Sequence, residues 1–255
     1  MRLVCDGFLN VTDGRGAPGI DEVKWLKPVR PGMILSMTAD VLSARASQSR
    51  PNIGLVQFRF TTMDQTGTSV MTQENFVMMG RRGSKQEPHR GAKPQGSTPL
   101  LPFDKPEKIP PFAELEPGQR VVLGSIEFTQ ESVLDFANRY DPQPFHTDLA
   151  AAETGPFGGL AASGWHTAAS WMRCFVNAVQ NSGAAVQAGP SPGFTNLRWL
   201  KPVYAGDTIS YDTRLLEKRL TSRPGWGLVK SKNSGTNQHG VTVFEFESAG
   251  FWKVT

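Results

Sequence analysis

The segment EVKWLKPVRPG (residues 22–32) occurs a second time in the chain as NLRWLKPVYAG (residues 196–206), at an offset of 174 residues. Farther along, SRPNIGLV (49–56) returns as SRPGWGLV (222–229), at an offset of 173 residues. An almost constant offset over separate segments indicates a duplicated structural unit, because chance matches would not keep their order and spacing. The sequence therefore predicts two related modules, in each of which the shared Trp-Leu-Lys-Pro-Val begins a strand.

The two modules are placed at residues 1–83 and 118–255, with a linker over residues 84–117. The linker prediction rests on a composition rich in Pro, Gly and Lys and on the lack of a periodic apolar pattern. Residues 118–171 of the second module have no counterpart upstream. We therefore expect the first module to lack its front half, either because that half was lost or because the chain is a fragment or begins at a misplaced start.

Both modules end in segments rich in β-branched and apolar residues with partial alternation, which predicts a meander of about three or four antiparallel strands in each. The second module adds one expected strand and three expected helices, at residues 124–129, 130–140, 146–155 and 164–180. Apolar residues cover most of the circumference of the last helix, as is typical of a buried central helix. This order of elements predicts an α+β fold.

Composition and charge exclude several classes of function. The net charge of +4 is modest and its Lys and Arg residues are dispersed, unlike the basic footprint of a nucleic-acid-binding protein. No apolar run approaches the roughly 18–20 residues that span a bilayer, and the first residues lack the order of a signal peptide. The cysteines Cys5 and Cys174 stand in unrelated contexts, so neither a disulfide nor a metal framework is predicted. We expect a cytoplasmic protein without a metal, nucleic-acid or membrane partner.

The stretch RYDPQPFHTD (residues 139–148) holds an acid and an imidazole, Asp141 and His146, around two prolines. The prolines keep the backbone extended, so both side chains are expected to turn toward one pocket and to hold a water molecule between them. An Asp close to a His favours the charged or polarised forms that proton transfer needs. Taken alone, Asp141 is more simply a turn or cap residue and His146 a polar residue at a helix start, but their joint spacing favours catalysis.

This stretch, followed by FGGLAASG (157–164) and a buried helix, resembles the MaoC-like dehydratase or (R)-specific enoyl-CoA hydratase family. The resemblance covers residues 118–255 and, as the rear part of a second module, residues 1–83. It implies a double hot-dog fold, in which curved antiparallel sheets each wrap a central helix and the first module lacks its front strand and most of its helix. It also implies that the two modules pair as a pseudo-dimer within the chain, or that two chains form a homodimer.

The resemblance implies a hydro-lyase of fatty acid metabolism, which converts a 2-enoyl-CoA reversibly to an (R)-3-hydroxyacyl-CoA. Asp141 and His146 match the catalytic dyad of the family, and Gly164 matches the glycine whose amide donates to the thioester oxygen. No metal or organic cofactor is implied beyond the CoA carried by the substrate. Two positions depart from the family pattern and are expected to bear on how the substrate is held: Gln143 stands where Asn is common, and Ser163 stands where many relatives carry His.

Several further residues are expected to bind substrate. Phe145, Phe157 and Trp165 line an acyl tunnel or, alternatively, pack in the core. Arg223, like its repeat counterpart Arg50, contacts either the CoA phosphates or the other module. Two other functions compete with the hydratase: a thioesterase on the same fold, and a non-catalytic acyl-binding or assembly module, which Gln143 and the missing front half make plausible.

Overall fold

The computed structural model describes residues 1–83, 105–183 and 186–254 of the chain. Most of the expected linker, residues 84–104, therefore lies outside the described residues. The chain divides into two compact units, and each combines separate segments of the sequence. Unit 1 comprises Met1–Gly96 and Thr129–Ser163, and unit 2 comprises Ser97–Phe128 and Gly164–Thr255. Unit 1 thus joins residues of the first module to a segment that the repeat assigns to the second.

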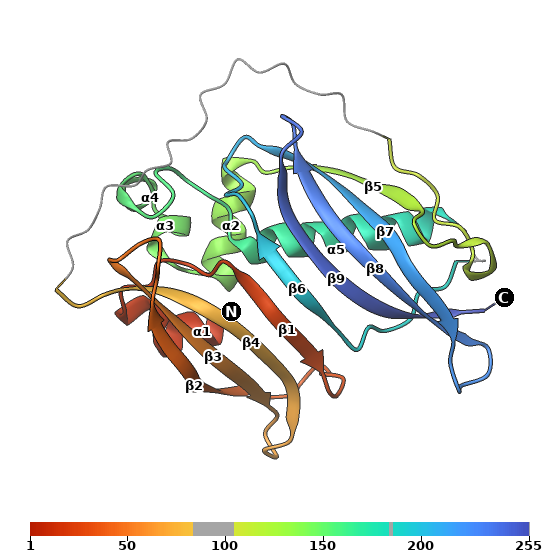
Figure 1. The fold of residues 1–255 in the computed structure, drawn as a ribbon, viewed down its shortest axis with the longest axis horizontal. Helices are drawn as coiled ribbons and strands as arrows, with labels where there is room; N and C mark the ends of the chain where they lie inside the picture. The colour runs from red at the N-terminus through yellow and green to blue at the C-terminus, as the bar shows by residue number, and fades with distance from the viewer. Residues whose placement is uncertain (84–104, 184–185, 255) are drawn as a thin grey trace. The chain divides into compact units, whose positions relative to one another are not determined.

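Unit 1 contains an antiparallel sheet with the strand order β2-β3-β4-β1 (Figure 1). Its strands are β1 (Gly19–Trp25), β2 (Ser36–Ala46), β3 (Ile53–Met63) and β4 (Ser69–Gly80). Successive side chains of a strand point to opposite faces, so Phe58 and Phe60 of β3 lie on the same face, and both are buried. That face forms the floor of an apolar core.

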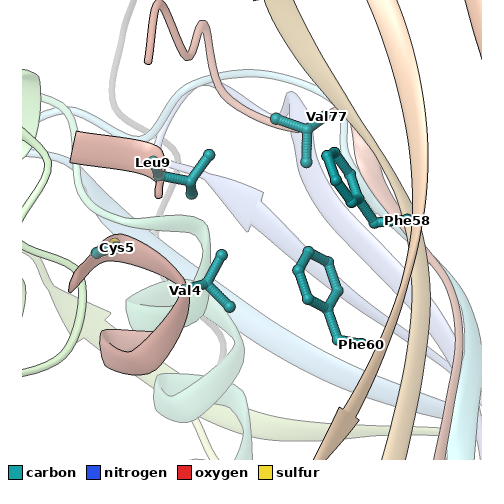
Figure 2. Packing of buried hydrophobic residues seen from close by; sticks show 6 residues of the cluster. All are labelled: Val4, Cys5, Leu9, Phe58, Phe60 and Val77. Atoms are coloured by element: carbon teal, nitrogen blue, oxygen red, sulfur yellow. The ribbon is translucent and has the colours of Figure 1, made fainter. Parts of the chain in front are cut away.

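The helices of unit 1 come from both modules. They are α1 (Arg2–Gly7), the 3-10 helix η1 (Leu9–Val11), α2 (Gln130–Tyr140), α3 (Pro144–Thr147) and α4 (Leu149–Thr154). Figure 2 shows the side chains of Val4 and Leu9 extending toward Phe58, Phe60 and Val77. Burying side chains of this kind stabilises a fold by roughly 1.5–3 kcal/mol each. The short helix α1 is therefore held on the sheet by its apolar residues.

Unit 2 contains the long helix α5 (Gly164–Asn181) and an antiparallel sheet with the order β6-β9-β8-β7-β5. Its other elements are η2 (Phe112–Glu114), β5 (Arg120–Glu127), β6 (Gly193–Trp199), β7 (Thr208–Leu220), β8 (Trp226–Asn237) and β9 (Thr242–Lys253). The buried face of α5 is tied to β7, since Tyr211 donates from its hydroxyl to the Thr167 carbonyl over 3.1 Å. The expected central helix thus lies against an antiparallel sheet.

The two repeats correspond strand by strand. In the order of the sequence, β1–β4 of the first module match β6–β9 of the second. The shared Trp-Leu-Lys-Pro-Val was predicted to begin a strand, but β1 and β6 end at its tryptophans, Trp25 and Trp199. Strand β7 pairs on its outer side with β5, for which the described part of the first module holds no counterpart, and α1 has 6 residues where α5 has 18. Within residues 1–83, the structure therefore shows no front strand and only a short helix, as the sequence predicts.

One expected helix is divided. The segment 146–155 was expected to form a single helix, but the structure shows α3 beginning at Pro144 and a separate helix α4 after Asp148. Asp148 has extended backbone angles, and its carboxylate accepts a hydrogen bond from the Ala151 amide at 2.7 Å. An N-cap of this kind starts a new helix, so it ends the preceding one.

Candidate active site

Asp141 directly follows helix α2 and lies in the interior of unit 1. Thr129 caps the start of α2 by accepting from the Ser132 amide, and the helix ends at Tyr140. Asp141 follows with non-helical backbone angles because Pro142 disfavours the helical conformation in the residue before it. Its side chain is buried, with 3% of the residue exposed. A cap position at a helix end thus holds an acid away from solvent.

His146 lies in α3, which begins with Pro144 at its first turn. The Nδ1 atom of His146 lies 2.7 Å from the carbonyl oxygen of Ala161. A carbonyl only accepts hydrogen bonds, so Nδ1 carries the proton and Nε2 of the neutral ring is left with a free lone pair. Burial lowers the pKa of His146, against the opposing effects of the Asp141 charge and the Ala161 carbonyl. The ring is therefore a neutral base at pH 7.

The Nε2 atom of His146 and the Oδ2 atom of Asp141 are 3.9 Å apart, and both side chains are almost fully buried. This separation is too long for a direct hydrogen bond. Moreover, a neutral Nε2 and a carboxylate oxygen both accept, so neither donates to the other. A molecule with two hydrogens to donate, such as water, would satisfy both atoms. The expected approach of the two side chains is observed, and a water molecule held between them stays a prediction.

Three side chains donate hydrogen bonds to the Asp141 carboxylate. Gln143 Nε2 and Cys5 Sγ reach Oδ1 at 2.9 Å and 3.3 Å, and Ser163 Oγ reaches Oδ2 at 2.6 Å. Gln143 and Ser163, expected to bind substrate, are buried here and directed at the acid. Cys5 was not among the predicted site residues. No local signal marks it, because it precedes Asp141 by 136 positions.

The aromatic residues Phe145 and Phe157 pack against the imidazole of His146. Phe145 meets His146 edge-on with ring centroids 4.6 Å apart, and Phe157 stacks on His146 at 5.9 Å with the ring planes 19° apart. The two phenylalanines also contact each other edge-on at 5.6 Å. These contacts place aromatic rings against two sides of the imidazole. An additional role of either residue in an acyl tunnel stays a prediction.

The remaining predicted site residues belong to unit 2. Gly164 begins α5, and a Cβ atom there would overlap the indole of Trp199, whose Nε1 donates to the Gly164 carbonyl at 2.9 Å. Trp165 lies edge-on to the same indole at 6.0 Å. Arg223 stands in the exposed turn between β7 and β8, with its guanidinium 5.1 Å from the ring centre of Trp226. The catalytic role of Gly164 and the substrate contacts of Trp165 and Arg223 stay predictions.

The described residues hold neither a metal-ligand cluster nor a membrane-spanning helix. Within residues 1–83, 105–183 and 186–254, no three His, Cys, Asp or Glu side chains are grouped as metal ligands would be. In the same part of the chain, no helix is both long enough and apolar enough to cross a membrane.

Comparison with known proteins places this site in a family context. A family model described as MaoC like domain matches residues 112–234. The uncharacterized protein YdeM of Bacillus subtilis is 30% identical over 130 residues, which are 51% of this chain and 89% of that protein. The residues that the family model matches include the segment that carries Asp141 and His146.

Solved structures establish the fold over nearly the whole chain. A MaoC domain protein from Chloroflexus aurantiacus superposes with a TM-score of 0.74 at 17% identity, over 95% of this chain and 77% of that one. A conserved hypothetical protein from Mycobacterium tuberculosis, described as having a double hotdog fold, superposes with a TM-score of 0.70 at 16% identity, over 98% and 80% of the two chains. The predicted double hot-dog fold is confirmed.

Proposed function

Because the chain belongs to the MaoC-like dehydratase family, we propose that it hydrates a 2-enoyl-CoA thioester reversibly to an (R)-3-hydroxyacyl-CoA. The observation that carries this proposal is the buried pair of Asp141 and His146, two hydrogen-bond acceptors held 3.9 Å apart. Addition of water to a conjugated thioester needs a base to take a proton and an acid to return it. A neutral imidazole with a free Nε2 serves both steps in turn.

In the proposed hydration, water sits between Asp141 Oδ2 and His146 Nε2. Nε2 takes one proton as the water oxygen bonds to the β-carbon, and the electron pair of the double bond moves toward the thioester oxygen. The imidazolium formed beside the Asp141 carboxylate is stabilised by the opposite charge. Nε2 then gives its proton to the α-carbon, so both hydrogens and the oxygen of water end in the product. Dehydration follows the same steps in reverse.

The other roles in the proposal come from the family resemblance. The Gly164 amide is assigned to the thioester oxygen, since the first amides of a helix have no partner within it and favour negative charge. Phe145, Phe157 and Trp165 are assigned to the acyl group, and Arg223 to the CoA phosphates. A cytoplasmic location, the pairing of modules or chains, and independence of a cofactor are part of the same proposal.

The experiment that tests the function is hydration of crotonyl-CoA, followed by the loss of absorbance of the conjugated thioester. Asp141→Asn is expected to lower the rate by about a hundredfold or more, the usual contribution of acid–base catalysis. Asp148→Asn is the matched control, because that exposed residue caps α4 and Asn also caps helices well. Equal rates for wild type and Asp141→Asn would refute the mechanism, and release of CoA without hydration would favour the thioesterase.

A further inference from the structure

The first module supplies one of the three donors to the Asp141 carboxylate. Gln143 and Ser163 belong to the same module as Asp141, but Cys5 comes from α1 at the other end of unit 1's sequence. Cys5 is fully buried, with 0% of the residue exposed. Burial raises the pKa of its thiol, and the charge of Asp141 raises it further. The side chain therefore keeps its hydrogen and remains a donor.

Contacts on two sides fix the position of α1. On one side, Val4 packs into the apolar cluster with Phe58 and Phe60 of the sheet (Figure 2). On the other side, Arg2 donates from Nη1 to the Asn138 carbonyl at 3.1 Å, in the last turn of α2. The helix that carries Cys5 is thus anchored to the helix that carries Asp141. A shift of α1 away from α2 or from the sheet would therefore break one of these contacts.

A loop of the first module lies against the same site. A Cβ atom on Gly14 would lie 3.9 Å from the Gln143 side-chain oxygen, and one on Gly16 would lie 3.6 Å from Cζ of Phe157. Gly16 has a φ of +88°, a conformation that favours glycine. The loop therefore approaches Gln143 and Phe157 closely, and the first module contacts the site through more than Cys5 alone.

We propose that Cys5 is a positioning residue for Asp141: its thiol, together with Gln143, occupies Oδ1 and so directs Oδ2 toward His146. This inference rests on the proposed function of the pair. Rotation of the carboxylate about its Cβ–Cγ bond would break the bonds from Cys5, Gln143 and Ser163 together. The orientation of Oδ2 decides where the water is held, and small displacements of reacting groups lower rates strongly. In this account the module without an Asp–His pair completes the pair of the other module.

The kinetic test compares Cys5→Ala and Cys5→Ser with wild type. The Ala variant loses the donor and is expected to lower kcat about tenfold with KM nearly unchanged, since the affected group acts on water rather than on substrate binding. The Ser variant keeps a hydroxyl donor and is expected to regain part of that loss. Cys174→Ala is the matched control, because it makes the same change at the other buried cysteine, on α5. Wild-type kcat in Cys5→Ala, or equal kcat in the Ala and Ser variants, would overturn the inference.

A second test does not depend on activity. The infrared S–H stretching band of Cys5 is assigned from the difference between wild type and Cys5→Ala, and it is expected at the lowered frequency of a hydrogen-bonded thiol. Asp141→Asn replaces the charged acceptor by a weaker neutral one, so the band is expected to move to higher frequency. A band that does not move would show that the thiol does not bond to Asp141. If wild type fails to hydrate crotonyl-CoA, the proposed function fails, and this band alone decides whether Cys5 holds Asp141.

Discussion

Replacement of Ser163 by Ala tests how the carboxylate of Asp141 is held. The Ser163 hydroxyl donates to Oδ2 over 2.6 Å, and 1% of the serine and 3% of the aspartate are exposed. The other two side-chain donors both reach Oδ1, so the substitution leaves Oδ2 without its side-chain donor. A hydrogen bond to a charged group contributes about 1.5–3 kcal/mol. We therefore expect the free energy of unfolding to fall by about 2 kcal/mol.

The assay is thermal unfolding together with steady-state kinetics. For a chain of this size, about 2 kcal/mol corresponds to a melting temperature lower by about 4–8 °C. The value of kcat is expected to fall about tenfold, because Oδ2 is the oxygen assigned to the reacting water. Ser170→Ala is the control, since Ser170 is buried but bonds to Tyr211. A Ser163→Ala variant with the melting temperature and kcat of wild type would refute the reasoning.

Two further predictions concern His146 and Gln143. Burial holds the pKa of His146 below its usual value in the folded chain. As the pH falls below about 6.5, the imidazole is therefore protonated in the unfolded chain before it is protonated in the folded chain. The free energy of unfolding decreases as a result. Between pH 7.5 and pH 5.5, the free energy of unfolding measured with urea is expected to fall by about 1 kcal/mol more in wild type than in His146→Gln. An equal decrease in the two proteins would contradict this. In wild type, the Gln143 amide donates to Asp141 Oδ1 over 2.9 Å, and the shorter side chain of Gln143→Asn withdraws that donor. This substitution is expected to lower the free energy of unfolding by about 1–2 kcal/mol. An unchanged urea midpoint would show that this hydrogen bond does not contribute to the free energy of unfolding.

The sequence predicted those features that local chemistry decides. Thr129 is a good N-cap and Pro142 restricts the residue before it, so α2 and its end at Tyr140 follow from nearby residues alone. The long apolar segment gave α5 nearly its observed bounds, Gly164–Asn181. The spacing of Asp141 and His146 around two prolines predicted that they approach each other, and they do.

Features that depend on tertiary packing could not be predicted in the same way. Gln143 and Ser163 are polar residues near the acid in sequence, but only the packed structure shows that both point at Asp141. Cys5 contacts Asp141 because α1 is held on the sheet by apolar residues 50 and more positions away, such as Phe58 and Phe60. No periodicity or motif in the sequence near Cys5 predicts such a contact.

The central claim is that Asp141 and His146 add water across the double bond of an acyl-CoA thioester. Mass spectrometry of the product formed from crotonyl-CoA in water enriched in heavy oxygen tests this claim most directly. The account predicts that the label enters the hydroxyl group at the β-carbon of an intact thioester, and that this labelled product is lost in Asp141→Asn. Label in the carboxylate of a free acid, or labelled hydroxyl product at the wild-type rate in Asp141→Asn, would contradict it.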